Sequence, residues 1–330
     1  MIRAYELTKK YGDNTVVQDL DFTVRPGTVT GFLGPNGAGK STTMRMLLGL
    51  DAPTRGRSTI GGRAYATHRA PLTEVGALLE ARSVHPGRTA FHHLMALAHT
   101  HGIPRARVEH VLGLAGLSAV AHKRVKGFSL GMGQRLGIAA ALLGDPATLI
   151  LDEPVNGLDP EGVRWIRDLL RSLARQGRTV LFSSHLMSEM ALTADHLIII
   201  GRGRLLADTK VAEFVATAGD ASVKVVTPQA DALRTLLTGP GIDIDLTTDT
   251  DTDSDTNSDN DITTDQGSSP AELEIRGTDA AHIGRTAAAH AIPLYELTPR
   301  TASLEQAFME LTQESVEYRI TAPEPTGAPA

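Results

Sequence analysis

The sequence predicts an α/β fold in two parts, and three observations carry that prediction. Short apolar runs typical of buried strands alternate with helical segments over roughly residues 1–215. One strand and one helix are joined by a glycine-rich turn, Gly34 to Thr42, that has the form of a phosphate-binding loop. Beyond residue 216 the order of elements becomes βαββαβ, which predicts a smaller α+β domain of the ferredoxin-like type.

Composition limits the classes of function. The 330 residues are 41% hydrophobic and 21% charged, as in globular proteins of one large domain or two. The chain has no cysteine, which excludes disulfides, thiolate catalysis and cysteine–zinc sites, and no HExxH pair, which excludes that metalloprotease class. A net charge of −6 gives no reason to expect nucleic acid as a partner. No apolar run approaches a membrane span or a signal peptide, so we expect a cytoplasmic protein.

The first 33 residues contain three β-rich runs separated by turns: Ile2 to Leu7, Val16 to Val24 and Thr28 to Leu33. We expect this region to form an antiparallel layer that feeds the strand of the glycine-rich loop. Tyr11 lies in the first turn, where its ring would either stack on an adenine or pack beneath its own turn. The sequence leaves both possibilities open.

The glycine-rich loop has the residues that a polyphosphate requires. Glycines let the backbone approach the ligand closely, and the N–H groups and dipole of the following helix favour negative charge. Lys40 would reach the β- and γ-phosphates, and the Ser41 hydroxyl would bind Mg²⁺. The alternative is a turn that binds nothing. The predicted nucleotide-binding residues of this loop are Gly34, Pro35, Asn36, Gly37, Ala38, Gly39, Lys40, Ser41 and Thr42.

Residues of about 80–145 are helical in pattern, with helices predicted around Leu94 to Ala98, at Arg105 to Leu114 and at Gly131 to Leu143. Ser129 precedes the third helix as an N-cap, so its hydroxyl and the following amides would form a second anion-binding terminus. An ordinary helix cap is the alternative at this position.

Two carboxylates follow the apolar strand Thr148 to Leu151. Asp152 and Glu153 would lie at the carboxyl end of a buried parallel strand, where ligands of α/β proteins bind. We expect Asp152 to bind Mg²⁺ and Glu153 to polarise an attacking water; solvated acids at a strand end are the alternative. The strand Thr179 to Ser183 brings His185 to the same edge.

Asp159 and Pro160 open a helix over Glu161 to Arg175, and a hairpin at residues 197–206 closes the first domain. The second domain is expected over 216–315, interrupted at about 247–268 by an Asp- and Thr-rich insert too polar to bury a core. A calcium loop is the alternative for this insert, but the glycine and glutamate that such a loop needs at its sixth and twelfth positions are missing. Residues 316–330 are expected to be a flexible tail.

Together these motifs resemble the ATP-binding cassette ATPases of ABC transporters over roughly residues 1–215. The resemblance implies a P-loop NTPase cassette with a mixed core sheet, an antiparallel β layer and a helical subdomain. It identifies Gly34 to Thr42 with the Walker A loop, Thr148 to Glu153 with Walker B, and Tyr11 with the adenine-stacking aromatic. Asp159 matches the D-loop acid and His185 the switch histidine.

Two motifs depart from the usual family pattern. The signature reads Phe128-Ser129-Leu130-Gly131-Met132, which keeps Ser129 and Gly131 but replaces the first glycine and the glutamine. Glu80 stands where the family has a glutamine near the nucleotide and the metal. Both departures, with a small C-terminal domain, resemble the ABC-2-type branch of drug and bacitracin-resistance exporters.

The resemblance implies ATP and Mg²⁺ as cofactors, with Lys40, Glu153 and His185 catalytic and Ser41, Asp152 and Glu80 near the metal. It also implies a head-to-tail homodimer, in which Ser129 caps the ATP of the partner subunit, attached to a separate ABC-2-type permease on the inner face of the cell membrane. The function implied is hydrolysis of ATP to power export of a drug-like or other small molecule. A cassette in translation or DNA repair and an ATP sensor without turnover are the alternatives.

Overall fold

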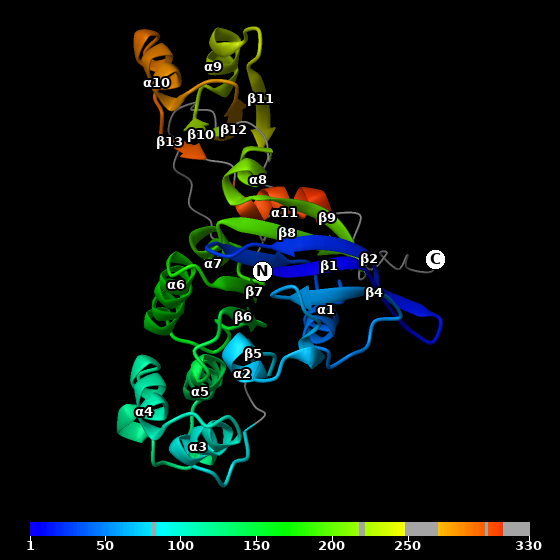
Figure 1. Ribbon diagram of the computed structural model, residues 1–330. Coiled ribbons are helices and arrows are strands. Elements are labelled where there is room, and N and C mark those ends of the chain that lie inside the picture. Colours follow the sequence, from blue (N-terminus) through cyan, green and yellow to red (C-terminus); the bar gives the residue numbers. More distant parts are fainter. Residues whose placement is uncertain (81–83, 218–221, 248–269, 301–302, 313–330) are drawn as a thin grey trace, which may run out of the picture. The chain divides into compact units, whose positions relative to one another are not determined.

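The computed structural model describes residues 1–80, 84–217, 222–247, 270–300 and 303–312, which divide into two compact units (Figure 1). The first unit comprises Met1–Phe214 and the chain from Phe308, and the second comprises Val215–Ala307. The Asp- and Thr-rich insert and the C-terminal tail expected from the sequence lie outside the described residues. No described helix is long and apolar enough to cross a membrane.

A six-stranded sheet of order β5-β6-β7-β3-β8-β9 forms the centre of the first unit. The strands from β5 to β8 run parallel, and β9 pairs antiparallel with β8 as the predicted hairpin. In chain order the strands are β3 (Val29–Leu33), β5 (Val75–Leu78), β6 (Thr148–Leu151), β7 (Thr179–Ser183), β8 (His196–Gly201) and β9 (Arg204–Lys210). All residues of β3, β6 and β7 are buried, as expected for parallel strands covered on both faces.

A three-stranded antiparallel sheet, β2-β1-β4, forms a second layer of this unit. It contains β1 (Ile2–Tyr11), β2 (Asn14–Val24) and β4 (Arg55–Ile60). The run Thr28 to Leu33 is not part of this layer, because β3 pairs parallel with β7 and β8 in the central sheet. The third strand is β4, a polar and largely exposed edge strand that lacks the apolar alternation by which strands are recognised.

The main core lies between these two layers, around α1 (Lys40–Leu47). Ile2, Leu20 and Phe22 from the antiparallel layer share it with Met44 and Leu47 of α1, and Phe32, Ile150, Leu181 and Ile198 of the central sheet complete it. Burial of α1 between two sheets fixes the direction in which its N-terminus points. The remaining helices of the first unit are α2 (Pro71–Glu74), α3 (Ala90–Thr100), α4 (Arg105–Leu114), α5 (Leu130–Leu142), α6 (Pro160–Arg175), α7 (Met187–Thr193) and α8 (Val211–Thr217).

Helices α3, α4 and α5 gather as a subdomain beyond β5 and β6 (Figure 1). The helix α4 has the predicted bounds, and Ser129 caps α5 by accepting a hydrogen bond from the Met132 N–H at 3.2 Å. The predicted α/β class with a helical subdomain is confirmed.

The second unit is a four-stranded antiparallel sheet of order β11-β12-β10-β13 with two helices. Its elements are β10 (Ser222–Thr227), α9 (Ala230–Leu237), β11 (Asp243–Thr247), β12 (Ala271–Arg276), α10 (Ala280–Ala289) and β13 (Glu296–Arg300). The last described helix, α11 (Leu304–Thr312), is divided between the two units at Phe308. The βαββαβ order confirms the ferredoxin-like prediction. From the sequence alone, the run Ile292 to Leu297 predicts the last strand, but β13 begins later, at Glu296. Ile292 is buried in the core from the loop before β13, which gives the run its strand-like pattern.

The helix α5 packs so closely on β5 that Gly76 leaves no room for a side chain. A Cβ at Gly76 would come within 2.0 Å of the Ala141 carbonyl oxygen, so Gly76→Ala must push α5 away from the sheet. We expect the free energy of unfolding to fall by about 2 kcal/mol, as in an overpacked core, which urea denaturation measures. The control is Gly133→Ala in α5, where a Cβ meets nothing within 4 Å. Stability of that variant should be unchanged or higher; equal effects of the two substitutions would contradict the close packing.

Candidate functional site

The loop from Gly34 to Gly39 connects β3 to the N-terminus of α1. Gly34 and Gly39 lie close to other segments of the backbone. Gly37 and Gly39 have φ of 82° and 96°, a region that favours glycine. A Cβ at Gly34 would lie 2.5 Å from the Ile200 carbonyl oxygen, and one at Gly39 would lie 2.9 Å from that of Val16. Gly39 offers no capping side chain to α1. The first N–H groups of the helix are therefore available to an anion.

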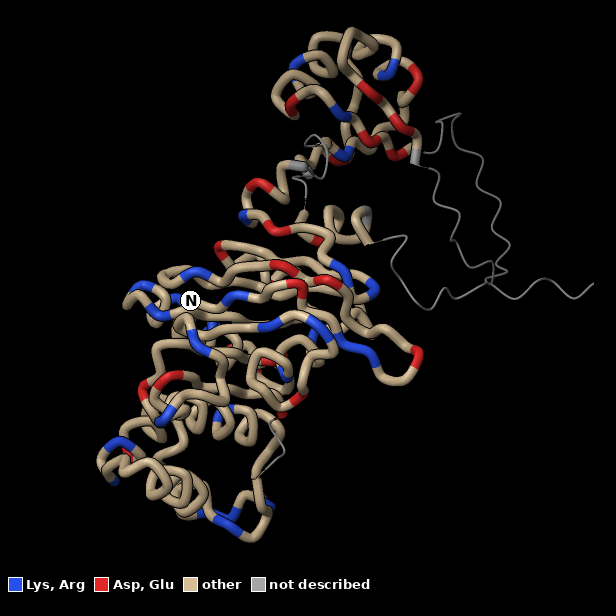
Figure 2. The backbone as a smooth tube through the Cα atoms, turned by 45° about the vertical axis from the view of Figure 1, so that its right-hand side comes forward, with Lys and Arg blue, Asp and Glu red and all other residues tan. Residues whose placement is uncertain are grey.

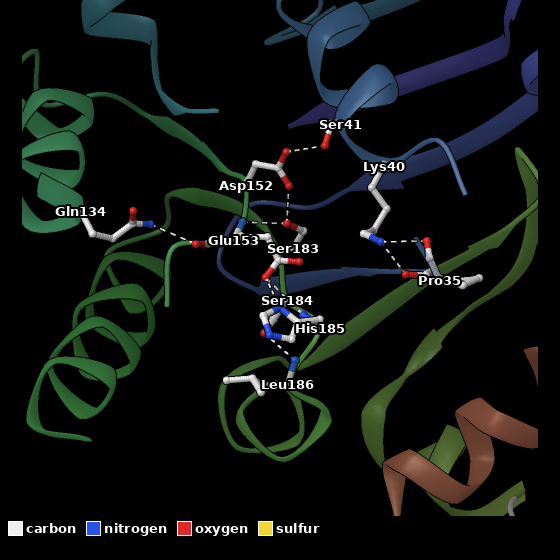
Figure 3. A network of polar contacts seen from close by, with 11 residues as sticks. Pro35, Lys40, Ser41, Gln134, Asp152, Glu153, Ser183, Ser184, His185 and Leu186 are labelled. Atoms are coloured by element: carbon white, nitrogen blue, oxygen red, sulfur yellow. Dashed lines mark hydrogen bonds and ion pairs between the residues drawn. The ribbon is translucent and has the colours of Figure 1, made fainter. Parts of the chain in front are cut away.

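Lys40 is folded back over this loop. Its Nζ donates hydrogen bonds to the carbonyl oxygens of Gly34 and Pro35, the latter at 3.1 Å (Figure 3). Burial lowers the pKa of the Lys40 ammonium, and the carboxylates of Glu153 and Asp152 act in the opposite direction. The ammonium is thus held at the loop by carbonyl oxygens that phosphate oxygens can replace.

Asp152 follows β6 and lies opposite the start of α1. One carboxylate oxygen accepts a hydrogen bond from the Ser41 hydroxyl at 2.6 Å, and the other accepts one from the Ser183 hydroxyl at 2.6 Å (Figure 3). Its N–H donates to the Leu78 carbonyl oxygen of β5 at 2.7 Å. The carboxylate is therefore oriented from three neighbouring elements, with one oxygen directed at Ser41.

Glu153 has a left-handed backbone, with φ of 49°, which is costly for a residue with a side chain. Its N–H donates to the Ser183 hydroxyl at 2.8 Å, and its carbonyl oxygen accepts from Gln134 Nε2 at 3.0 Å and from the Asn156 N–H at 3.2 Å. These bonds from β7, α5 and the following turn hold the unusual backbone. They turn the Glu153 side chain away from that of its neighbour Asp152.

His185 contacts the Glu153 carboxylate. The ring Nδ1 of His185 lies 2.8 Å from Glu153 Oε2, and the backbone N–H of His185 donates to the same oxygen at 3.3 Å (Figure 3). The His185 side chain is more than half exposed, whereas that of Glu153 is about a quarter exposed. The pair therefore places an ionisable ring at the open side of the site.

The loop and both carboxylates line one cleft. Its volume is about 330 Å³, and its lining combines the loop residues from Asn36 to Thr42 with Asp152 and Glu153. A neighbouring cleft of about 470 Å³ is lined by Glu80 together with Ser41 and Asp152. The structure thus brings together the phosphate-loop residues and the acids that the sequence singled out.

A third cleft is larger, about 550 Å³, but lies at the opposite ends of the parallel strands, near the first residues of β3 and β8. Its acids are already engaged, since Asp195 accepts the Val29 N–H at 2.8 Å and Asp208 pairs with His196. It has no glycine-rich loop at a helix N-terminus. The cleft around Lys40 is therefore the candidate phosphate-binding site.

Ser129, Gly131 and Asp159 gather elsewhere, where the N-termini of α5 and α6 approach each other. A Cβ at Gly131 would lie 2.8 Å from the Gly157 carbonyl oxygen, and Asp159 caps α6 by accepting from the Gly162 N–H at 2.8 Å. The described residues that line the cleft around Lys40 do not include these three. They form a second surface of the same unit.

Tyr11 ends β1, and its side chain is 49% exposed, so the ring is not packed beneath its turn. Its hydroxyl donates to Asp51 at 3.3 Å, and Lys9 Nζ lies 4.8 Å from the ring centroid. The ring is outside the described lining of the cleft.

Two residues that hold the carboxylates, Ser183 and Gln134, are not predicted from the sequence. Both side chains are buried, Ser183 fully and Gln134 to all but 4%. The signal that could have found them is a polar residue in an otherwise apolar element, since a buried polar group needs a partner.

Comparison with known proteins identifies relatives of both units. A family model described as "ABC transporter" matches residues 17–156, and one described as "Domain of unknown function (DUF8746)" matches residues 221–305. The chain is 36% identical over 314 residues to the uncharacterized ABC transporter ATP-binding protein YhcH of Bacillus subtilis, covering 94% of this chain and 95% of the relative. It is 44% identical over 209 residues to the bacitracin transport ATP-binding protein BcrA of Bacillus licheniformis, covering 62% of this chain and 68% of the relative.

A solved structure of an ATP-binding subunit of an ABC transporter matches with a TM-score of 0.61 at 27% identity. That alignment covers 66% of this chain and 92% of the other. The dimeric ATP-binding cassette MJ0796 bound to ADP and Pi matches with a TM-score of 0.59 at 23% identity, over 64% and 99% of the two chains, and shows the shared fold.

The left-handed backbone at Glu153 has a measurable consequence. Glu153→Gly and Glu153→Ala both remove the contacts with His185, but only glycine is free of strain at this φ. We expect Glu153→Gly to be more stable than Glu153→Ala by about 1 kcal/mol, measured by urea unfolding. The matched control is the same pair at Asp152, which does not have a positive φ and where alanine should be at least as stable as glycine. A more stable alanine variant at position 153 would refute the strained geometry.

Proposed function

The chain belongs to the ABC transporter ATP-binding proteins, and from that premise we propose that it powers export of a drug-like or other small molecule through a separate membrane permease. As a member of this family it is the ATP-binding subunit of a transporter and an ATPase. The observation that carries the proposal is the convergence of the phosphate loop, the Ser41–Asp152 pair and the Glu153–His185 pair on one side of the sheet. The relative named for bacitracin transport supports this class of cargo.

Nucleotide binding would use the loop amides, the α1 N-terminus and Lys40. On binding, the Lys40 ammonium exchanges the carbonyl oxygens of Gly34 and Pro35 for phosphate oxygens. Because Lys40 is partly desolvated already, little water has to be removed when it meets the phosphates. Tyr11, exposed at the end of β1, is the proposed stacking surface for adenine.

The donor set fits Mg²⁺, a hard cation that prefers oxygen ligands and retains some of its waters. Ser41 Oγ and Asp152 Oδ2 reach the same point, and Glu80 lines the adjoining cleft. In the described chain no three His, Asp or Glu side chains cluster to hold a metal by themselves. We therefore propose Ser41 and Asp152 as ligands, with Glu80 nearby and phosphate oxygens supplying the rest. When bound, Mg²⁺ neutralises charge on the transferred phosphoryl group.

Hydrolysis would depend on the separate tasks of the two acids. Ser183 fixes Asp152 toward Ser41, while Glu153 points to the open side, where it can orient a water for attack. His185, held by the same carboxylate, is placed to contact the γ-phosphate. Positioning and electrostatic stabilisation supply most of the catalysis in phosphoryl transfer.

A second copy of the chain would complete each site. Ser129 and Gly131 present the N-terminus of α5, and the Ser129 side chain is exposed, so this surface can meet the phosphates held by another copy. We propose a head-to-tail homodimer with two composite ATP sites, closed by Asp159 and its neighbours. The dimer would act on an ABC-2-type permease at the inner face of the membrane.

Two substitutions separate nucleotide binding from hydrolysis. Lys40→Ala removes the charge on the phosphates and should abolish productive nucleotide use. Glu153→Gln keeps the shape of the side chain but removes the base, so it should bind ATP, lose nearly all turnover and accumulate as an ATP-bound dimer.

The measurements are phosphate release and sizing chromatography with ATP and Mg²⁺. A matched control is Glu74→Gln, which makes the same chemical change at an exposed position at the end of α2, outside the described lining of the cleft. Near-normal turnover by Glu153→Gln would remove that residue from catalysis, and absence of an ATP-dependent dimer would refute the composite site.

A further inference from the structure

The helical subdomain differs in charge from the rest of the chain. Residues 84–144 contain seven Lys and Arg and a single acid, Glu109, although the whole chain has a net charge of −6. In Figure 2 the region around α3 and α4 carries blue segments and scarcely any red. A concentration of one sign of charge in one subdomain points to a partner of the opposite sign.

Four of these cations lie on two loops that are bonded to each other, residues 85–89 and 122–126, here called the basic loop pair. The Val125 N–H donates to the Arg88 carbonyl oxygen at 2.9 Å, and the Lys126 N–H donates to that of Pro86 at 3.1 Å. A β-bridge joins Thr89 to Arg124. The backbone therefore holds Arg88, Lys123, Arg124 and Lys126 together.

These four side chains are exposed, and among the described residues none of them forms an ion pair. The other cations of the subdomain differ: Arg105 pairs with Glu109 at 2.7 Å, Arg107 with Asp145 at 2.9 Å and Arg135 with Asp159 at 3.7 Å. The charge of the basic loop pair is thus uncompensated within the described chain. Such charge is available to a partner.

We propose that the basic loop pair binds anionic phospholipid headgroups of the inner membrane leaflet. Each Lys or Arg near such a surface strengthens attachment by about fivefold. The cytoplasmic loops of a permease carry an excess of Lys and Arg, so they would repel this surface, whereas lipid phosphates would attract it. The inference rests on the proposed placement at a membrane, and it adds a direct contact with lipid to the contact with the permease.

The full chain is tested by flotation with vesicles, without nucleotide or permease. Vesicles of phosphatidylcholine alone are compared with vesicles that also contain phosphatidylglycerol. The test variant replaces Arg88, Lys123, Arg124 and Lys126 with Gln. The control variant makes the same change in charge at four other exposed positions, Arg63, Arg164, Arg171 and Arg175.

We expect the wild type to bind only the anionic vesicles and to be released by high salt, because exposed charges are screened. The test variant should lose more than about tenfold in affinity, while the control variant binds like the wild type. A variant with Lys123→Arg and Lys126→Arg keeps the charge and should therefore retain binding. Thermal unfolding of all variants checks that the loops are intact. Because the assay involves no ATP, its failure leaves the proposed ATPase untouched.

Three results would overturn the inference. The first is equal binding of the wild type to both kinds of vesicle. The second is an equal loss of vesicle affinity in the test and control variants. The third is release of the chain from anionic vesicles by a short RNA that the chain binds more tightly than the vesicles. The last result would assign the surface to nucleic acid.

Discussion

The carboxylates of Asp152 and Glu153 point in different directions, although the two residues are neighbours in the chain. The buried hydroxyl of Ser183 fixes both orientations. Ser183 at the end of β7 donates to Asp152 and accepts from the Glu153 N–H, both at less than 3 Å. A fully buried hydroxyl in a low-dielectric setting forms strong bonds and is costly to leave unpaired. The pairing of β6 with β7 is thereby tied to the orientation of both acids, one toward Ser41 and one toward His185.

The same arrangement extends to the other elements of the first unit. Asp152 bonds to β5 through the Leu78 carbonyl oxygen, and β5 packs closely on α5 at Gly76. In α5, Gln134 donates to the Glu153 carbonyl oxygen at 3.0 Å, and Ser129 is the N-cap of the same helix. One helix therefore links the proposed contact with a second copy to the backbone of the proposed base. A movement of α5 would therefore shift the Glu153 backbone. This bond is a route by which the proposed dimer closure could be coupled to hydrolysis.

The sequence predicted elements whose chemistry is local. The phosphate loop, the acids after a buried apolar strand and the βαββαβ order can all be recognised within short windows. It did not predict β4, whose polar edge strand has no pattern of burial, or the start of β13, because Ile292 is buried from a loop. Ser183 and Gln134 were missed because their roles depend on contacts across 31 and 19 residues of the chain, which spacing does not reveal. The left-handed backbone of Glu153 is likewise a product of tertiary contacts.

The most direct measurement of the role of Ser183 is the rate of phosphate release from ATP by Ser183→Ala beside Ser184→Ala. Both serines are buried neighbours, but the Ser184 hydroxyl accepts from the Leu186 N–H at 3.1 Å and forms no described bond to either carboxylate. If Ser183 keeps the two acids in their separate tasks, Ser183→Ala lowers kcat by about tenfold to a hundredfold, the cost of a misplaced catalytic group. Ser184→Ala then stays near the wild-type rate. Equal rates for the two variants, with both folded, would contradict this account of the site.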